Sequence, residues 1–234
     1  MLLKELIYKK KTRLCFSADF KTKEKLFYWI ELLGPHICIL KTHIDILEDF
    51  DESVIEKLLF YKKKFNFYIL EDRKFSDIGK TFRNQLYCGI YKIASWADII
   101  TIHGISAYGM LNQLDELAPK VLIVSQMSSE NNLIDKNYSI KCYNLAKQFN
   151  KLVIGFISQN KFVDDNNFLF LTPGVKILDM TQTAEKEADQ NYRSPKQALK
   201  NDRNDIIIVG SGIYSNKKNI NEYIEQYKYF RLLH

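Results

Sequence analysis

Charged residues are concentrated in one seven-residue stretch of the sequence, which holds Glu71, Asp72, Arg73, Lys74 and Asp77. The stretch follows an apolar run at residues 67–70 that is typical of a buried strand. Neighbouring carboxylates favour the charged form of a lysine. A charged lysine can give a proton to a carbanion, whereas attack on a carbonyl requires the free amine. The stretch therefore predicts a proton donor, Lys74, held between carboxylates.

Six other apolar runs also end in hydrogen-bonding or ionisable groups. These ends are Ser17-Ala18-Asp19, Lys41-Thr42-His43, Thr101-Ile102-His103-Gly104, Ser125-Gln126-Met127-Ser128, Thr172-Pro173-Gly174 and Gly210-Ser211-Gly212. Any single one could cap a helix, as Asp72 or Ser76 could do after residues 67–70. Their recurrence instead favours one shared site, because the carboxyl ends of parallel strands meet at one end of a barrel.

The last two of these ends predict an anion site. Both consist of small residues that leave backbone N–H groups accessible, and glycine lets a ligand approach the backbone closely. In barrels of alternating strands and helices, the loops after the last two strands often bind phosphate. A lone Gly-x-Gly is weak evidence, but its place after the last apolar run gives it weight, so we expect Pro173, Gly210 and Ser211 to take part.

The elements that must position these residues alternate along the chain. Strands are expected at 12–18, 36–40, 65–70, 97–102, 121–125, 152–157, 168–171 and 205–209, and helices at 24–33, 53–64, 77–92, 107–117, 138–149, 195–200 and 220–232. Most strand runs are continuously apolar, which suits parallel strands buried on both faces. The link between the sixth and seventh strands has room for a turn at most. The pattern predicts an α/β protein, a single-domain (β/α)₈ TIM barrel over residues 1–234. A doubly wound open sheet is the alternative, but no Gly-x-Gly-x-x-Gly follows the first strand.

Composition excludes several classes of protein. The chain has 234 residues, 46% of them hydrophobic and 26% charged, as in an ordinary globular domain. Its net charge of +6 comes mainly from scattered lysines, so a solvated surface is favoured over nucleic-acid binding, although some of the charge could attract an anionic substrate. The four cysteines are widely spaced, which argues against zinc or disulfides and suits small buried side chains. Without a signal or an 18-residue apolar span, we expect no membrane association and a cytoplasmic location.

With these residues in view, the chain resembles the orotidine 5′-monophosphate decarboxylases, especially the eukaryotic-type sequences. The strongest stretches are residues 34–47, 71–81, 95–98, 153–157, 171–175 and 205–210. The motif Asp72-x-Lys74-x-x-Asp77 alone is shared with a wider suprafamily of sugar-phosphate decarboxylases and synthases. The resemblance implies a carboxy-lyase that needs neither cofactor nor metal and converts orotidine 5′-monophosphate to uridine 5′-monophosphate in pyrimidine biosynthesis.

The resemblance also implies catalytic roles. Lys74 matches the proton donor to C6 of the pyrimidine, and Asp72 matches the carboxylate beside the departing CO₂. Lys41 belongs to the same charged array. Asp77 and Thr81 match residues that reach the site of a neighbouring subunit, so the family resemblance implies a homodimer.

Substrate-binding positions follow from the same resemblance. Asp19 and Lys41 match ribose-binding residues, and Ser17 and Ser128 match residues that contact the pyrimidine. Gln190 and Tyr192 match residues that grip the phosphate, and residues 175–188 would form a closing loop.

The sequence departs from the family at the predicted anion site. The family usually has Gly-Arg-Gly where this chain has Gly210-Ser211-Gly212, so a phosphate-binding arginine is absent. The backbone amides and the Ser211 hydroxyl, or Lys217 or Lys218, could bind the phosphate instead. The departure keeps two alternatives open: a catalytically weakened barrel that binds nucleotides or serves as a structural dimer, and another phosphosugar lyase of the suprafamily. Ser17 and Ser128 argue against the second.

Overall fold

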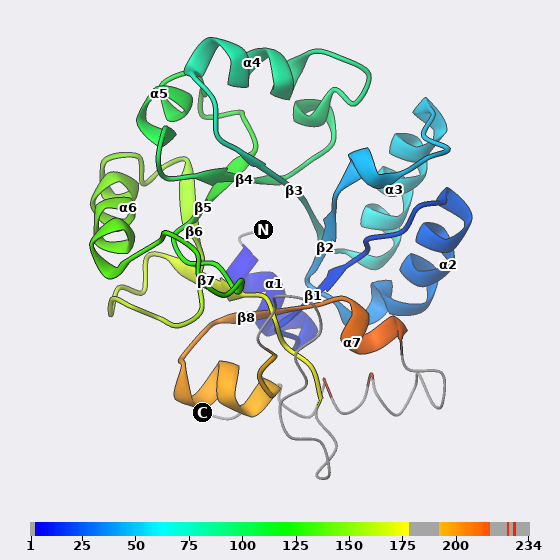
Figure 1. Cartoon of the computed structure of the whole chain (residues 1–234). Coiled ribbons are helices and arrows are strands. Elements are labelled where there is room, and N and C mark those ends of the chain that lie inside the picture. The colour runs from blue at the N-terminus through cyan, green and yellow to red at the C-terminus, as the bar shows by residue number, and fades with distance from the viewer. Residues whose placement is uncertain (1–2, 178–191, 216–223, 225–226, 228–234) are drawn as a thin grey trace.

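Eight parallel strands close into a barrel in which each strand pairs with the next along the chain (Figure 1). The computed structural model describes residues 3–177, 192–215, 224 and 227. The strands are β1 (Leu14–Ser17), β2 (Ile39–Thr42), β3 (Tyr68–Phe75), β4 (Ile99–His103), β5 (Lys120–Val124), β6 (Val153–Ile157), β7 (Leu169–Thr172) and β8 (Ile206–Val209). Because β1 also pairs with β8, the sheet is closed. The predicted (β/α)₈ barrel is confirmed, and the open sheet is excluded.

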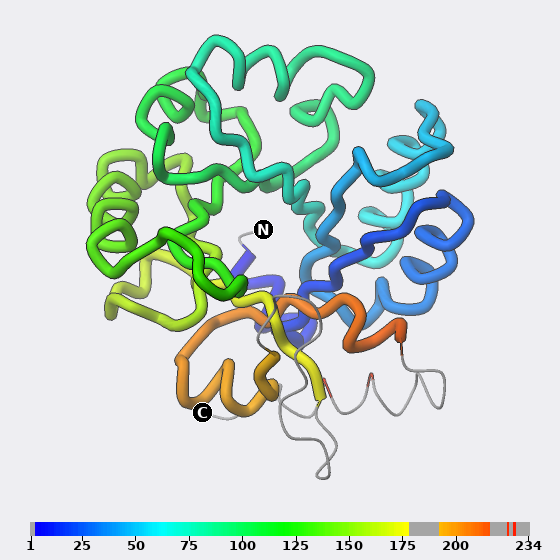
Figure 2. Tube along the Cα trace, viewed as in Figure 1, coloured from blue at the N-terminus to red at the C-terminus, as the bar shows by residue number. Residues whose placement is uncertain are grey.

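Helices surround the barrel (Figure 2). They are α1 (Leu3–Lys10), α2 (Lys23–Leu33), α3 (Glu52–Phe65), α4 (Gly79–Tyr87), α5 (Ala107–Leu111), α6 (Lys136–Gln148), a π-helical turn (Gln197–Asn201) and α7 (Ser211–Tyr214). The expected helices at 77–92 and 107–117 are shorter than predicted, and α1 and α7 were not predicted. As expected, no helix separates β6 from β7. The helix expected at 220–232 lies mostly outside the described residues.

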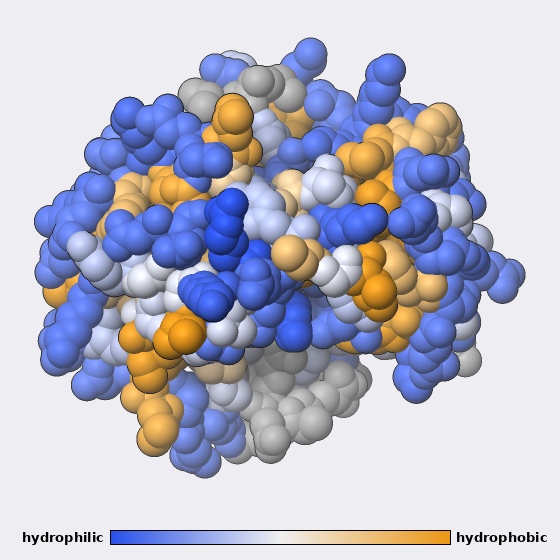
Figure 3. All heavy atoms as spheres, turned by 90° about the horizontal axis from the view of Figure 1, so that it is seen from above, coloured by the Kyte–Doolittle hydropathy of each residue, from blue (hydrophilic) through white to orange (hydrophobic). Residues whose placement is uncertain are grey.

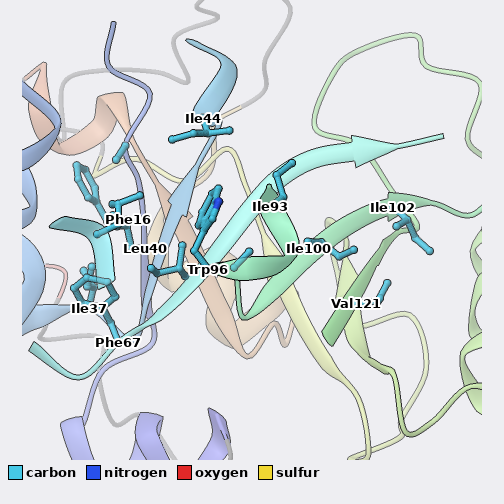
Figure 4. Close-up of a cluster of buried hydrophobic side chains, with 14 of the residues drawn as sticks. Phe16, Ile37, Leu40, Ile44, Phe67, Ile93, Trp96, Ile100, Ile102 and Val121 are labelled. Carbon is cyan, nitrogen blue, oxygen red and sulfur yellow. The ribbon is translucent and has the colours of Figure 1, made fainter. Parts of the chain in front are cut away.

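Two apolar clusters hold the barrel together. The larger one fills the layer between strands and helices, where Phe16, Leu40 and Trp96 lie among the side chains drawn in Figure 4. The smaller one includes side chains from all eight strands together with Leu3 and Leu6 of α1, which lies across one end of the barrel (Figure 1). Strands β1, β2, β7 and β8 are buried at every position, which suits their mainly apolar sequences; polar residues occur only at the carboxyl ends of β1, β2 and β7.

Three of the four cysteines are buried, as their spacing suggested, but Cys88 is exposed just after α4. Hydrophilic residues cover most of the face shown in Figure 3, and separate apolar patches interrupt them. Among the described residues, no helix combines the length and the apolar character that crossing a membrane requires.

Candidate active site

The charged stretch lies on the end of strand β3, not in the loop after it. The sequence predicted that this strand ends at Leu70, but the strand continues to Phe75. Between the pairs Glu71–Ile100 and Phe75–Ile102, β3 has three residues where β4 has only Thr101. This irregularity is a bulge, a feature that often re-aims side chains beside active sites.

Thr101 fixes the bulge through its hydroxyl group. The hydroxyl donates to Asp72 Oδ1 at 2.8 Å and accepts from the backbone N–H of Lys74 at 2.9 Å. Lys74 has φ +51°, a left-handed conformation that a non-glycine residue adopts at a cost of about 1–3 kcal/mol. Sequence reasoning gave Thr101 no role of its own. In the structure it joins the Asp72 carboxylate to the backbone of Lys74.

Asp72 connects two lysines at the centre of the site. Its Oδ2 atom accepts from Lys41 Nζ at 2.9 Å and from Lys74 Nζ at 2.8 Å. The side chains of Asp72 and Lys41 are only 9% and 6% exposed, whereas that of Lys74 is 33% exposed. Burial opposes the charged carboxylate, but Lys41, His43 and Lys74 together outweigh it and hold the pKa of Asp72 well below its usual range. The carboxylate is therefore charged at neutral pH.

A second carboxylate, Asp19, extends this network on the side of β1. Its Oδ2 accepts from the Ser17 hydroxyl at 2.7 Å, its Oδ1 lies 2.6 Å from His43 Nδ1, and Lys41 Nζ is 3.9 Å from the same oxygen. The His43 ring also approaches Asp72 Oδ2 at 3.4 Å. Burial would raise the pKa of Asp19, but Lys41, His43 and Ser17 lower it well below its usual range.

His43 was placed by the sequence at the end of β2 but was given no function. The available signal was its spacing: it stands two residues after Lys41, and alternate residues of a strand point to the same side. Asp19, Lys41, His43, Asp72 and Lys74 are called the charged end of the site below.

Glu71 belongs to the charged stretch in sequence but lies away from it in space. It is fully buried, and its carboxyl group accepts from the Thr42 hydroxyl at 2.7 Å and from the backbone N–H of Ile44 at 3.1 and 3.2 Å. Burial raises the pKa of Glu71 to about 8. Glu71 therefore supports the loop after β2, which carries His43, and does not line the cavity.

A cavity of about 310 Å³ opens above the charged end. This volume lies at the lower limit of the range usual for small-molecule sites. The cavity brings together ten of the residues predicted from the sequence: Ser17, Asp19, Lys41, Asp72, Lys74, Ser128, Pro173, Tyr192, Gly210 and Ser211. His43, Gly174 and Tyr214 also line it and were not predicted as site residues.

The side of the cavity opposite the charged end is built largely from backbone and hydroxyl groups. Gly210 packs so closely on β1 that a Cβ atom there would lie 3.2 Å from Ser17 Cβ. The Tyr192 hydroxyl lies 3.3 Å from Ser211 Oγ, and Lys176 Nζ lies 5.6 Å from the centroid of the Tyr192 ring. Pro173, Gly174, Tyr192, Gly210 and Ser211 are called the anion end below.

Arg193 ties the anion end to the barrel. Its backbone N–H donates to Gly174 O at 2.9 Å, and its carbonyl accepts from Lys176 N–H at 3.0 Å. Its guanidinium donates to the Thr172 hydroxyl at the end of β7 and to Asp202. These contacts fix the backbone on which Tyr192 stands.

Several predicted residues of this region lie outside the described residues. They are Gln190, Lys217, Lys218 and most of the expected closing loop, of which only 175–177 are described.

Asp77 and Thr81 lie outside the cavity of this chain. Asp77 stands between β3 and α4, where its Oδ1 accepts from the backbone N–H of Ile78 at 2.7 Å, and Thr81 is in the first turn of α4. The residue before α4 is Ile78, which makes no side-chain cap, so neither Asp72 nor Ser76 caps this helix. That Asp77 and Thr81 serve a neighbouring subunit therefore stays a prediction.

Comparison with known proteins gives consistent matches. The model of the "Orotidine 5'-phosphate decarboxylase / HUMPS family" matches residues 12–227. The chain is 40% identical over 230 residues to the orotidine 5'-phosphate decarboxylase of Rhizomucor pusillus, covering 96% of this chain and 86% of that protein. It is 39% identical over 215 residues to the uridine 5'-monophosphate synthase of Bos taurus, covering 90% of this chain and 44% of that protein. The crystal structure of orotidine 5'-phosphate decarboxylase from Pyrococcus horikoshii OT3 has the same fold, with a TM-score of 0.71 at 18% identity, covering 93% of this chain and 98% of that one.

Proposed function

The chain belongs to the orotidine 5'-phosphate decarboxylase / HUMPS family, and we propose that it decarboxylates orotidine 5′-monophosphate to uridine 5′-monophosphate in pyrimidine synthesis. It is thus a carboxy-lyase. The motif Asp72-x-Lys74-x-x-Asp77 is expected in a wider suprafamily of phosphosugar enzymes, but relatives at about 40% identity over most of the chain are named decarboxylases. Ser17 and Ser128, the two residues expected to contact the pyrimidine, both line the cavity, which supports a pyrimidine nucleotide as the substrate.

The observation that carries the proposal is the pairing of both lysines with one oxygen of Asp72. Lys41 and Lys74 lie at 2.9 and 2.8 Å from Asp72 Oδ2, yet they differ in exposure. Lys41 also lines the cavity but is almost fully buried, so its part in the reaction is to hold the carboxylate in place, besides its expected contact with the ribose. Lys74 is one-third exposed and lines the cavity, so its ammonium group can touch a bound substrate. The two lysines therefore have different roles.

Lys74 meets the chemical demand of the reaction. When the bond from C6 to the carboxylate breaks, the electron pair stays on C6, which has no adjacent group to delocalise it. A fixed ammonium group stabilises this charge as it develops, because it needs no reorganisation at the moment of reaction. Lys74 then transfers one N–H proton to C6, and the resulting amine regains a proton from solvent. Asp72 keeps the ammonium in place and puts negative charge beside the departing carboxylate.

Other cavity residues are proposed to bind the ribose and the phosphate of the nucleotide. Asp19 and Lys41 are proposed to bind the ribose, and the anion end to bind the phosphate. Binding energy from the phosphate, which does not react, can be used to orient the base above Lys74. Tyr192 and Ser211, whose hydroxyl groups are 3.3 Å apart, form a pair of hydrogen-bond donors for this purpose.

A direct assay tests the proposal. Purified wild-type protein should consume orotidine 5′-monophosphate, followed by the change in its ultraviolet absorbance, and Lys74→Ala should lower kcat by about 10⁴-fold because it removes both the charge and the proton. Lys63→Ala, on the exposed face of α3, is the matched control and should keep the wild-type rate. Absence of turnover by the wild type at high substrate would favour the nucleotide-binding or structural barrel, to which the loss of the family arginine at Ser211 points.

We further propose a homodimer in which Asp77 and Thr81 complete the neighbouring site. Both residues lie outside the cavity of their own chain, and exposed apolar side chains are found nearby, with Ile78 69% and Tyr108 61% exposed. The inactive variants Lys74→Ala and Asp77→Ala should therefore complement each other after mixing and subunit exchange. One intact site per mixed dimer predicts recovery of about a quarter of wild-type activity per chain. Mixtures that stay inactive although mixed dimers form would contradict the shared site.

A cytoplasmic location is likewise proposed. All four cysteines are free, and the exposed thiol of Cys88 suits a reducing compartment. Recovery of the protein in an organelle or membrane fraction after cell fractionation would contradict this assignment.

A further inference from the structure

His43 lies inside the charged end but has no part in the reaction as described so far. Its ring is 24% exposed and lines the cavity, and each ring nitrogen approaches a different carboxylate. Building on the proposed decarboxylation, we propose that His43 is a positioning residue: its neutral ring accepts a hydrogen bond from Lys74 and aims the ammonium group, and protonation of the ring removes this support.

The hydrogen of the neutral ring is assigned by the contacts of Nδ1. This atom lies 2.6 Å from Asp19 Oδ1, and a charged carboxylate can only accept a hydrogen bond. Nδ1 must therefore carry the hydrogen. Lys41 Nζ is 3.4 Å from Nδ1, but an ammonium group is only a donor and cannot compete for that hydrogen. Its shorter contact is with Asp72.

The second nitrogen then has a free lone pair directed at Lys74. In the neutral ring Nε2 can only accept, and Lys74 Nζ lies 3.3 Å away. The Lys74 ammonium has three hydrogens: one is donated to Asp72 at 2.8 Å and a second to His43. Two fixed hydrogen bonds leave the third hydrogen for the substrate. His43 thereby sets the direction of the proton that is transferred.

Protonation of His43 would reverse this arrangement. An Nε2–H group cannot accept from Lys74, and its nearest acceptor is Asp72 Oδ2 at 3.4 Å, which both lysines already use. The imidazolium would then compete with Lys74 for the same oxygen and repel its charge. We expect Lys74 to lose the fixed direction that proton transfer needs.

The charged groups around the ring determine the pH at which His43 is protonated. Two carboxylates face the ring, Asp19 from the loop after β1 and Asp72 from β3. Two ammonium groups also face it, Lys41 from β2 and Lys74 from β3. Glu71 lies on the opposite face of β3. Burial lowers the pKa of His43, but the hydrogen bonds to Asp19 and Asp72 outweigh burial and raise it above its usual value. Because the active form is the neutral ring, kcat should fall as the pH drops through this raised pKa.

Two substitutions separate the contributions of the two nitrogens. The amide of His43→Asn can take the place of Nδ1 and keep the bond to Asp19, but it has nothing at Nε2. The longer His43→Gln can place its carbonyl oxygen near the Nε2 position, where it accepts from Lys74 and does not titrate. Because a misplacement of about 1 Å can cost about 100-fold, we expect His43→Asn to lower kcat by about 100-fold with little change in KM. His43→Gln should stay within about ten-fold of the wild type and lose the acidic fall in kcat.

The measurement is kcat and KM for orotidine 5′-monophosphate between pH 5 and 9, with thermal unfolding to confirm that each variant is folded. His36→Asn, in the turn before β2 and away from the cavity, is the control that should keep the wild-type profile. Equal losses of kcat in the Asn and Gln variants would overturn the proposal, as would an acidic fall that survives in His43→Gln. His103 also lies near Lys74, so disappearance of the fall only in His103→Gln would assign it there. An inactive wild type would instead count against the decarboxylase itself.

Discussion

The charged end and the anion end face the same cavity but are built in opposite ways. The charged end consists of side chains at the ends of β1, β2 and β3, and its charges are paired with one another within the chain. The anion end consists of backbone and hydroxyl groups after β7 and β8, and the neighbouring Lys176 lies over the Tyr192 ring. The groups that we propose to react are thus held by ion pairs without substrate, whereas the groups that we propose to bind the phosphate carry no charge of their own.

This difference determines how each end should respond to substitution. Removing one member of a buried ion pair leaves the other charge without compensation, which costs about 3–5 kcal/mol. Adding or removing one hydrogen bond to a charged ligand changes affinity by about 1.5–3 kcal/mol and leaves the folded chain intact. Changes at the charged end should therefore alter stability and kcat together, and changes at the anion end should alter KM.

The largest effect is expected from Asp72→Asn. The substitution leaves Lys41 buried beside a neutral amide, so the free energy of unfolding in urea should fall by about 3–5 kcal/mol. Asp45→Asn is the control, because its contact with Arg73 is exposed, and its effect should stay within about 1 kcal/mol. If Asp72→Asn were as stable as the wild type, the charged end would not be the tightly coupled unit described above.

Glu71→Gln should have an intermediate effect that depends on pH. Burial raises the pKa of Glu71 to about 8, so the folded chain keeps a proton that the unfolded chain releases near pH 4.5. The resulting stabilisation is complete below about pH 4.5 and is lost as the pH rises through about 8. Between pH 6 and 8 the wild type should lose about 2 kcal/mol relative to Glu71→Gln in urea unfolding. The exposed Glu56→Gln should show no such trend, and a trend in the opposite direction would place a charged carboxylate at Glu71.

The anion end and most of the charged end could be predicted from the sequence, because both lie at the ends of strands. The eight strands could be located because most of their runs are continuously apolar, and a barrel brings their ends together. The end of β3 was misplaced because charged residues are typical of loops. The strand continues there because Thr101, from the neighbouring β4, satisfies Asp72 and Lys74, and such a contact cannot be read from spacing along one segment.

The parts that sequence reasoning missed depend on contacts between segments. The role of His43 follows from its distances to residues on β1 and β3, and the sequence gives only its place after Lys41. Helix α7 has only four residues, which is too short for any periodic pattern. Glu71 and Asp72 are adjacent in sequence but point to opposite faces of β3, because successive side chains of a strand alternate.

The smallest effect is expected from Ser211→Arg, which tests the anion end alone. An arginine here would stand beside the Tyr192 hydroxyl and restore the charge that the family usually has at this position. A charge-assisted hydrogen bond to the phosphate should lower KM by about ten-fold, while kcat stays within about two-fold because the charged end is unchanged. Ser215→Arg is the matched control: it adds the same charge at an exposed position after α7 and should leave KM unchanged. An equal fall in KM in both variants would show that general attraction of the anion is sufficient. A change in kcat without a change in KM would mean that the two ends of the cavity do not act separately.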